Sequence, residues 1–241
     1  MNTTTIKTPK LPGAGISNRP LHFFYICDCS GSMNVDGKIQ ALNYAVKSTI
    51  PAMRDAASDN IHAQVLVRAL KFSSGAQWHI AQPTPVEELE WTDLTTNGVT
   101  DMGKALAMVA EQLEINNMPK RALPPVLVLI TDGHPTDDFD RGLKKLMEQP
   151  WGKKAVRIGI SIGQDADNEV LQKFIAHPEL TPYSAKNAEQ LVELIKWAST
   201  SVLQAASSPA SQSKNAAPVA GNVPIPQAPV SNTVNNVGDV W

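Results

Sequence analysis

The sequence predicts an α/β fold of the doubly wound type, with a mostly parallel central sheet, one antiparallel edge hairpin and helices on both faces. Two short segments, residues 21–27 and 125–131, are continuous apolar runs, which are typical of strands buried on both faces. Amphipathic segments with helical spacing lie between the strand candidates. Because strands and helices alternate in this way, the pattern predicts a sheet that is covered by helices above and below.

Other segments complete the predicted sheet. Only Gly75 separates residues 63–74 from residues 76–82, so the two segments predict the single hairpin. Residues 155–163 alternate apolar side chains with polar or small ones, Arg157 among them, and we expect this strand to be half exposed. A weak final strand is expected near residues 181–185.

Apolar stripes that repeat every three to four residues predict the helices. The predicted helices lie within residues 39–53, 102–113, 137–149, 167–176 and 191–202. Pro51 lies inside the first of them. Because proline lacks a backbone N–H and clashes with the preceding turn, we expect it to kink or restart that helix.

The chain of 241 residues divides by composition into one folded region and two ends. Residues 1–19 form a predicted flexible leader, and residues 20–203 form the predicted domain. Residues 204–241 are rich in Pro, Ala, Ser and Asn and contain too few large apolar side chains to build a core, so they predict a disordered tail.

Charge and hydropathy exclude several functions. The formal net charge is −2, and no long basic run occurs, so neither nucleic acid nor an anionic membrane is an expected partner. The sequence has no secretory signal and no apolar run near the roughly 20 residues that span a bilayer, which predicts a soluble, cytoplasmic protein. Cys27 and Cys29 lie two apart, at a strand and its exit, and are poorly placed to bridge, so we expect two reduced thiols.

Oxygen-bearing side chains follow the predicted strands. Asp28, Ser30 and Ser32 come directly after the first strand, and Asp132 follows the strand at residues 125–131, while Thr100 lies in the loop before a helix. In doubly wound sheets, functional sites lie beyond the carboxyl ends of the strands. Carboxylates and hydroxyls are hard donors that suit Mg²⁺, Mn²⁺ or Ca²⁺ and not Zn²⁺. The set therefore predicts a metal centre.

Two catalytic interpretations compete with a binding site. A phosphate loop would use Gly31, Gly37 and Lys38, but the glycine spacing is too long by one residue and Ile39 stands where Ser or Thr is required. A phosphoryl-transfer enzyme would use Asp28 as nucleophile with Mg²⁺ beside it. That chemistry calls for a second carboxylate nearby, and position 30 is Ser. A third alternative is a structural scaffold whose metal site stays empty.

The acidic residues near the proposed centre have simpler roles. Asp101 is expected to be an acid at a helix N-terminus, where it would face the positive end of the helix dipole. Asp137 and Asp138 suit the start of the next helix, with Thr136 as its cap.

The five oxygen donors match a known pattern. Asp28, Ser30 and Ser32 in a DxSxS motif, then Thr100, then Asp132 in ITDG, resemble the metal-ion-dependent adhesion site (MIDAS) of von Willebrand factor type A domains. The resemblance covers roughly residues 20–203 and implies the Rossmann-like fold of that family. Segments such as VRALKFSSGAQWHI and PWGKKAVRIGISIG resemble its bacterial TerY-like branch, which is associated with tellurite-resistance and stress gene clusters.

The resemblance implies a protein-binding module and no enzymatic activity. It implies Mg²⁺, or Mn²⁺ or Ca²⁺ in its place, held by the five donors and completed by an Asp or Glu of a protein partner. It also implies a role in a bacterial stress-response or signalling system beside a PP2C-type phosphatase and a Ser/Thr kinase. The Mg²⁺-dependent phosphoryl-transfer enzyme that uses Asp28 remains the alternative.

Overall fold

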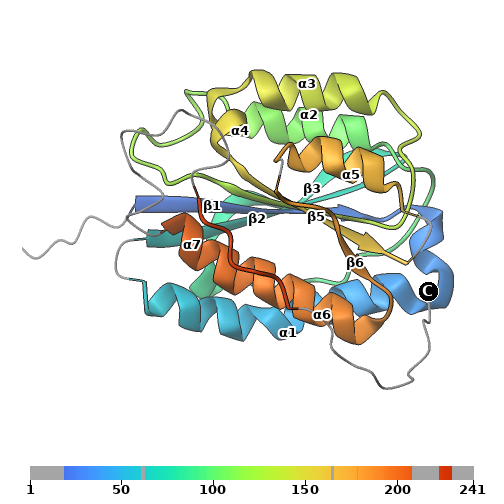
Figure 1. Ribbon diagram of the computed structural model, residues 1–241, viewed down its shortest axis with the longest axis horizontal. Helices are drawn as coiled ribbons and strands as arrows, with labels where there is room; N and C mark the ends of the chain where they lie inside the picture. Colours follow the sequence, from blue (N-terminus) through green and yellow to red (C-terminus); the bar gives the residue numbers. More distant parts are fainter. Residues whose placement is uncertain (1–18, 61–62, 164–165, 178, 208–222, 230–241) are drawn as a thin grey trace, which may run out of the picture.

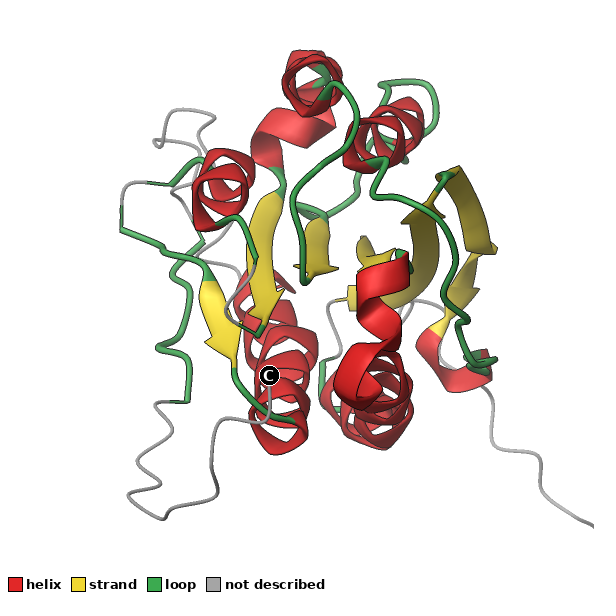
Figure 2. Cartoon of the chain, turned by 90° about the vertical axis from the view of Figure 1, so that its right-hand side faces the viewer, coloured by secondary structure: helices red, strands yellow, loops and turns green. Residues whose placement is uncertain are grey.

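The computed structural model describes residues 19–60, 63–163, 166–177, 179–207 and 223–229. These residues form three layers, with a central sheet between two layers of helices (Figure 1). The view along the strands separates the layers clearly (Figure 2). The predicted leader and most of the predicted tail lie outside the described residues.

The central sheet has six strands in the order β3-β2-β1-β4-β5-β6. The strands are β1 (Arg19–Asp28), β2 (Ala63–Ser73), β3 (Gly75–Pro85), β4 (Val126–Thr131), β5 (Val156–Ile162) and β6 (Tyr183–Ala185). All neighbours pair in parallel except β2 and β3, which form an antiparallel edge hairpin. This confirms the predicted fold class.

Helices cover both faces of the sheet (Figure 1). The helices on one face are α2 (Met102–Gln112), α3 (Phe139–Glu148), α4 (Pro150–Lys154) and α5 (Asn168–Ile175). Those on the other face are α1 (Lys38–Ser58), α6 (Ala188–Trp197), the π-helical turn η3 (Ala198–Val202) and α7 (Leu203–Ser207). Two 3₁₀ segments, η1 (Gly31–Gly37) and η2 (Val86–Glu88), lie in loops.

Alternate residues of β1 supply the two cores. Phe23 and Tyr25 pack toward α1 and α6, whereas Phe24 and Ile26 pack toward α2, and all four are fully buried. This is the period of two that a strand covered on both faces requires. The two cores hold β1 and β4 side by side at the centre, which fixes the loops that leave their carboxyl ends.

The prediction that residues 155–163 are half exposed is wrong, because every residue of β5 is buried. The Arg157 side chain donates hydrogen bonds to the backbone carbonyls of Phe174 and Gly152, both at 2.8 Å. At Gly159 an added Cβ would lie 3.2 Å from the Leu171 side chain, so the glycine admits α5 close to the strand. The small and polar positions of β5 therefore face packed side chains and backbone carbonyls, not solvent.

Two further findings differ from the sequence expectations. Helix α1 runs through Pro51 from Lys38 to Ser58 as one helix, so it does not restart there. Residues 223–229, within the predicted tail, pack on the core beside α1 and α6: Val223 is 6 % exposed, and Ile225 and Ala228 are partly buried. Val223 and Ile225 are two residues apart, so an extended segment can turn both side chains toward that core.

Candidate metal centre

The register of the sheet brings two of the predicted acids together. Strands β1 and β4 are adjacent and parallel, with Cys27 opposite Ile130. Asp28 ends β1, and Asp132 follows β4 directly, so both carboxylates leave the same edge of the sheet. Both residues are buried. This juxtaposition is the one that the sequence predicts for the carboxyl ends of parallel strands.

A chain of hydrogen bonds links the hydroxyls to these acids. The Ser30 and Ser32 hydroxyl oxygens are 2.9 Å apart, and the Ser32 hydroxyl donates to Asp132 Oδ1 at 2.7 Å. Ser30 is buried, whereas Ser32 lies at the surface. The structure thus brings together oxygens of Ser30, Ser32 and Asp132, with one side open to solvent.

The Asp28 carboxylate is oriented by its neighbours. The backbone N–H of Ser30 donates to Oδ1 at 2.8 Å, and the Thr131 hydroxyl donates to Oδ2 at 2.5 Å. Burial raises the pKa of Asp28 to about 6, the hydrogen bonds from Thr131 and Ser30 oppose that rise, and the nearby charge of Asp132 adds to it. A bound cation would offset this desolvation, because it favours the ionised form of the carboxylate.

Thr100 lies close to Gly133. A Cβ added at Gly133 would be 3.8 Å from the Ser32 hydroxyl and 3.9 Å from the Thr100 hydroxyl, so both oxygens lie near the same point. The Thr100 backbone is held by two bonds to Thr136, one from the Thr100 N–H to the Thr136 hydroxyl and one from the Thr136 N–H to the Thr100 carbonyl. Thr136 therefore positions Thr100 and does not cap α3.

Lys38 is a site residue that the sequence analysis missed. Its ammonium donates to Asp132 Oδ2 at 2.9 Å, and the two side chains are 7 % and 0 % exposed. The only sequence signal was its place after Gly37, which led to the rejected phosphate-loop interpretation. In the structure, Lys38 begins α1 and places a positive charge on the second oxygen of Asp132.

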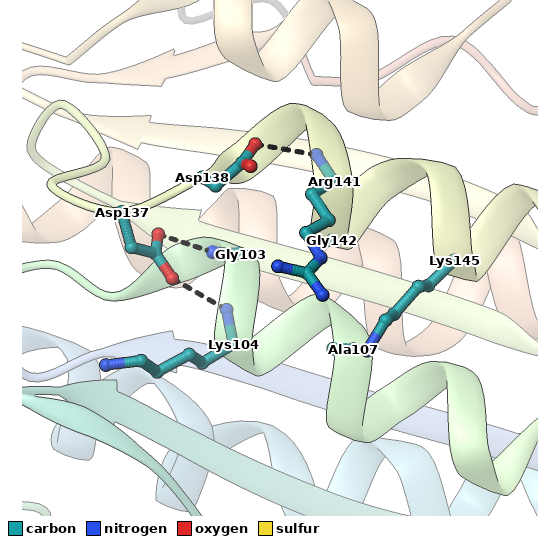
Figure 3. A pocket seen from close by; sticks show the side chains of 8 residues that line it. All are labelled: Gly103, Lys104, Ala107, Asp137, Asp138, Arg141, Gly142 and Lys145. Carbon is teal, nitrogen blue, oxygen red and sulfur yellow. Dashed lines mark hydrogen bonds between the residues drawn. The ribbon is translucent and has the colours of Figure 1, made fainter.

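The acids after Asp132 fix the helices behind the centre (Figure 3). Asp138 caps α3 by accepting from the Arg141 N–H, whereas Asp137 accepts from the Gly103 and Lys104 N–H groups at the start of α2. From the sequence, Asp137 was expected at the start of α3. In the structure it caps α2 instead.

The Asp101 carboxylate binds groups outside the five proposed donors. Its Oδ2 accepts from the Gly75 N–H and from the Lys104 ammonium, both at 2.6 Å, and the contact with Lys104 is the main reason that the pKa of Asp101 is lowered. Asp101 therefore ties α2 to the β2-β3 turn.

The donor types fit a hard divalent cation. Within the described residues, no group of three or more His, Cys, Asp or Glu side chains is placed to hold a metal. The centre instead combines two carboxylates with hydroxyls, which are oxygen donors throughout. Cys29 lies within the same loop, but it is buried, and burial raises the pKa of its thiol to about 12, so a thiolate is not formed near neutral pH.

The family model of the von Willebrand factor type A domain matches residues 24–197. The chain belongs to this family. Its domains are commonly metal-dependent modules for protein interaction. No curated protein matches the sequence. Within the described residues, every helix is too short or too polar to cross a membrane.

Solved structures share the fold at low sequence identity. The ArnB paralog VWA2 from Sulfolobus acidocaldarius is 18% identical with a TM-score of 0.56, over 74% of this chain and 45% of that one. A von Willebrand factor type A protein from Catenulispora acidiphila is 20% identical with a TM-score of 0.57, over 78% and 43%. Proximal thread matrix protein 1 from the mussel byssus, with a zinc-occupied MIDAS motif, is 16% identical with a TM-score of 0.57, over 76% and 48%. This chain thus spans less than half the length of each.

Proposed function

We propose that this chain is a metal-ion-dependent protein-binding module and not an enzyme. The observation that carries the proposal is the charge balance of the candidate centre. Asp28 and Asp132 supply two negative charges, and Lys38 brings one positive charge onto Asp132. A divalent cation held there would leave a net positive centre beside an exposed hydroxyl, Ser32. Such a centre attracts an anionic oxygen from outside, and an Asp or Glu of a protein partner supplies one.

Mg²⁺ is the cation that we propose, held by Asp28, Ser30, Ser32, Thr100 and Asp132. Mn²⁺ and Ca²⁺ accept the same donor types. The cation would supply electrostatic attraction for the partner's carboxylate. The chain's own residues would orient the donors: Thr131 holds Asp28, Lys38 holds Asp132, and Thr136 holds the Thr100 backbone.

We further propose a cytoplasmic setting in a bacterial stress-response or signalling system of the TerY-like kind, with a PP2C-type phosphatase and a Ser/Thr kinase as partners. The support is the sequence resemblance of the segments around β2, β4 and β5. Two free, buried cysteines, Cys27 and Cys29, are compatible with a reducing compartment.

Phosphoryl transfer from Asp28 fits the geometry poorly. The residue is fully buried, and both carboxylate oxygens already accept hydrogen bonds. A nucleophile needs an oxygen that can reach a phosphorus atom. A phosphatase assay with Mg²⁺ on the purified chain tests this alternative, and turnover that is lost in Asp28→Ala would establish it.

The binding proposal is tested in two steps. Calorimetry of Mg²⁺ with the full chain should give one site that is lost in Asp28→Ala and weakened in Thr100→Ala, with Glu111→Ala as control because Glu111 is an exposed acid on α2. Pulldown from the native cell should then recover a partner with Mg²⁺ and lose it with EDTA or in Asp28→Ala. Partner binding that ignores both EDTA and Asp28→Ala would overturn the proposal.

A further inference from the structure

A polar pocket lies beside the candidate metal centre, between the β2-β3 hairpin and the loop before Thr100. Its volume is about 350 Å³. The polar side chains that line it are Lys71, Ser73, Ser74, Gln77, Thr95 and Asn97. Cys29, the residue between Asp28 and Ser30, also lines it, so the pocket and the candidate metal centre share one loop.

Backbone hydrogen bonds tie this pocket to the metal loop. The Cys29 N–H donates to the Phe72 carbonyl at 2.8 Å, and the Asn97 N–H donates to the Cys29 carbonyl at 2.8 Å. Two residues after Cys29, the Gly31 N–H donates to the Gly98 carbonyl at 3.0 Å. A ligand in the pocket would therefore lie at a fixed position relative to Asp28 and Ser30.

Lys71 gives the pocket an uncompensated positive charge. It is the only charged side chain among the described lining residues, it is half-buried, and it makes no ion pair within the described part of the chain. The nearby acid Asp101 is already engaged by the Gly75 N–H and by the Lys104 ammonium. A half-buried cation without a counter-ion favours an anion from outside.

The other lining groups indicate which anion fits. Hydroxyls and amides from Ser74, Thr95, Asn97 and Gln77 can donate several hydrogen bonds. A carboxylate has two oxygens, whereas a phosphate monoester presents three strong acceptor oxygens and up to two charges. A Lys ammonium binds phosphate as a point charge, so it leaves the other phosphate oxygens to the surrounding donors. The donor-rich pocket with one Lys therefore suits a phosphate group.

We propose that this pocket binds a phosphorylated Ser or Thr side chain of the partner whose carboxylate reaches the metal. The inference rests on the proposed function for the identity of the partner, but the phosphate site itself is independent of metal. A second basic hollow, of about 230 Å³ between α2 and α3, is less suited. Arg141 and Lys145 reach across it in Figure 3, but Asp137 and Asp138 belong to the same wall.

The test is an amide chemical-shift titration of the full chain in EDTA with N-acetyl-phosphoserine amide, N-acetyl-aspartate amide and inorganic phosphate. The phosphoserine probe should give saturable shifts at Gly75, Gln77 and Asn97 and bind about tenfold more tightly than the aspartate probe. It should also bind more tightly than inorganic phosphate. Equal or tighter binding of inorganic phosphate would identify a site for the free ion and overturn the proposal.

Variants complete the test. Lys71→Gln should weaken the phosphoserine probe about tenfold, Thr95→Val should weaken it with no effect on folding because Thr95 is exposed, and the exposed control Lys120→Gln should leave it unchanged. Equal binding of the aspartate probe, unchanged affinity in both pocket variants, or shifts confined to Arg141 and Gly142 would overturn the proposal. Mg²⁺ titrations of the same samples report on the metal centre separately. Failure of the phosphate site can therefore be distinguished from failure of the proposed metal-dependent function.

Discussion

At the scale of single residues, Lys38 sets the charge of the candidate centre. Its ammonium is buried against Asp132, so the pair is shielded from solvent and strongly coupled. Removing one member of a buried pair leaves the other charge uncompensated. Lys38 thus has two effects: it stabilises Asp132 when no metal is bound, and it keeps the metal-loaded centre positive.

Lys38→Met keeps the length of the side chain and removes the charge. Without metal, we expect a loss of about 3–5 kcal/mol in the free energy of unfolding, because Asp132 stays buried and unpaired. Mg²⁺ should bind about tenfold more tightly than in the wild type, because a repelling charge is gone. Calorimetry and urea unfolding with and without Mg²⁺ measure both effects.

Lys47→Met is the matched control, because Lys47 forms an ion pair with Asp93 in which both side chains are exposed. We expect it to change stability by under about 1 kcal/mol and to leave Mg²⁺ affinity unaltered. Equal Mg²⁺ affinities in Lys38→Met and Lys47→Met would contradict the role given to Lys38.

His22 links stability to pH from the opposite end of β1. It is 3 % exposed, and neither ring nitrogen has a hydrogen-bond partner among the described residues. Burial, with the nearby charge of Arg68, lowers its pKa from 6.5 to about 4. The unfolded chain therefore binds a proton that the folded chain does not between these values. Stability from His22 is complete above pH 6.5 and is lost as the pH falls toward 4.

We expect the wild type to lose about 3 kcal/mol of stability from this residue between pH 7 and pH 4, since each pKa unit corresponds to about 1.4 kcal/mol. His22→Leu removes that titration. Asp28 has a raised pKa, so its contribution to stability grows as the pH falls, opposite to that of His22. Because Asp28 is present in both proteins, the difference between their unfolding free energies cancels its contribution. A difference that stays constant from pH 7 to pH 4 would refute the role of His22.

The candidate site shows how far sequence reasoning reaches at this scale. Asp28, Ser30, Ser32, Thr100 and Asp132 were predicted as one set from two strand ends, one helix-entry loop and the resemblance to the MIDAS pattern. The structure brings Ser30, Ser32 and Asp132 into one hydrogen-bonded chain. Lys38 was missed because no local sequence pattern predicts that the first residue of α1 contacts Asp132, which lies 94 residues away in the chain. The metal-binding role of the set is still a proposal.

At the scale of elements, α2 and α3 pack with their backbones in close approach. A Cβ at Gly142 would lie 2.2 Å from the Gly103 carbonyl oxygen, and one at Gly103 would lie 2.3 Å from the Asp138 carbonyl oxygen. Backbone cannot yield as a flexible side chain does. Since α2 begins next to Thr100, the contact between these helices also fixes one proposed metal ligand.

Gly142→Ala should therefore destabilise the protein by about 1–3 kcal/mol through overpacking, although alanine favours a helix more than glycine does. It should also weaken Mg²⁺ binding, because α2 would shift with Thr100. Lys144→Ala, an exposed position on the same helix, is the control. Thermal unfolding and calorimetry measure the two effects. If Gly142→Ala were more stable than the wild type, the helix contact would be looser than the structure indicates.

Element types were predicted well where the pattern of apolar residues decides them, as in the continuous apolar runs of β1 and β4 and the helical periodicity of α2. Strand β5 was assigned correctly but with the wrong exposure. Its Arg157 is satisfied by carbonyls of residues 152 and 174, and its Ser161 hydroxyl donates to the Tyr183 carbonyl at 3.3 Å. Those acceptors belong to other elements, so a pattern of alternating polarity within one segment could not distinguish burial from exposure.

At the scale of the whole molecule, the core beneath the sheet is completed from a distant part of the chain. Residues 223–229 run along the layer formed by α6 and α7 (Figure 1). Val223, Ile225 and Ala228 contact the same core as α1 and α6. Composition predicted no structure in this region, because few apolar residues in a proline-rich stretch cannot build a core of their own. They can nevertheless cover one that already exists.

The double variant Val223→Asp/Ile225→Asp tests whether this segment belongs to the cooperative unit. Burying a carboxylate without a partner is unfavourable, so the segment should detach and expose the apolar surface beneath it. We expect a loss of about 2–4 kcal/mol in the free energy of unfolding, from the transfer of two apolar side chains to water. Urea unfolding measures that loss, and amide exchange should become faster in α6 and α7.

Gln227→Asp, at an exposed position of the same segment, introduces a charge without removing an apolar contact and should stay within about 0.5 kcal/mol of the wild type. Identical unfolding of the two variants would mean that the core beneath the sheet is complete without residues 223–229.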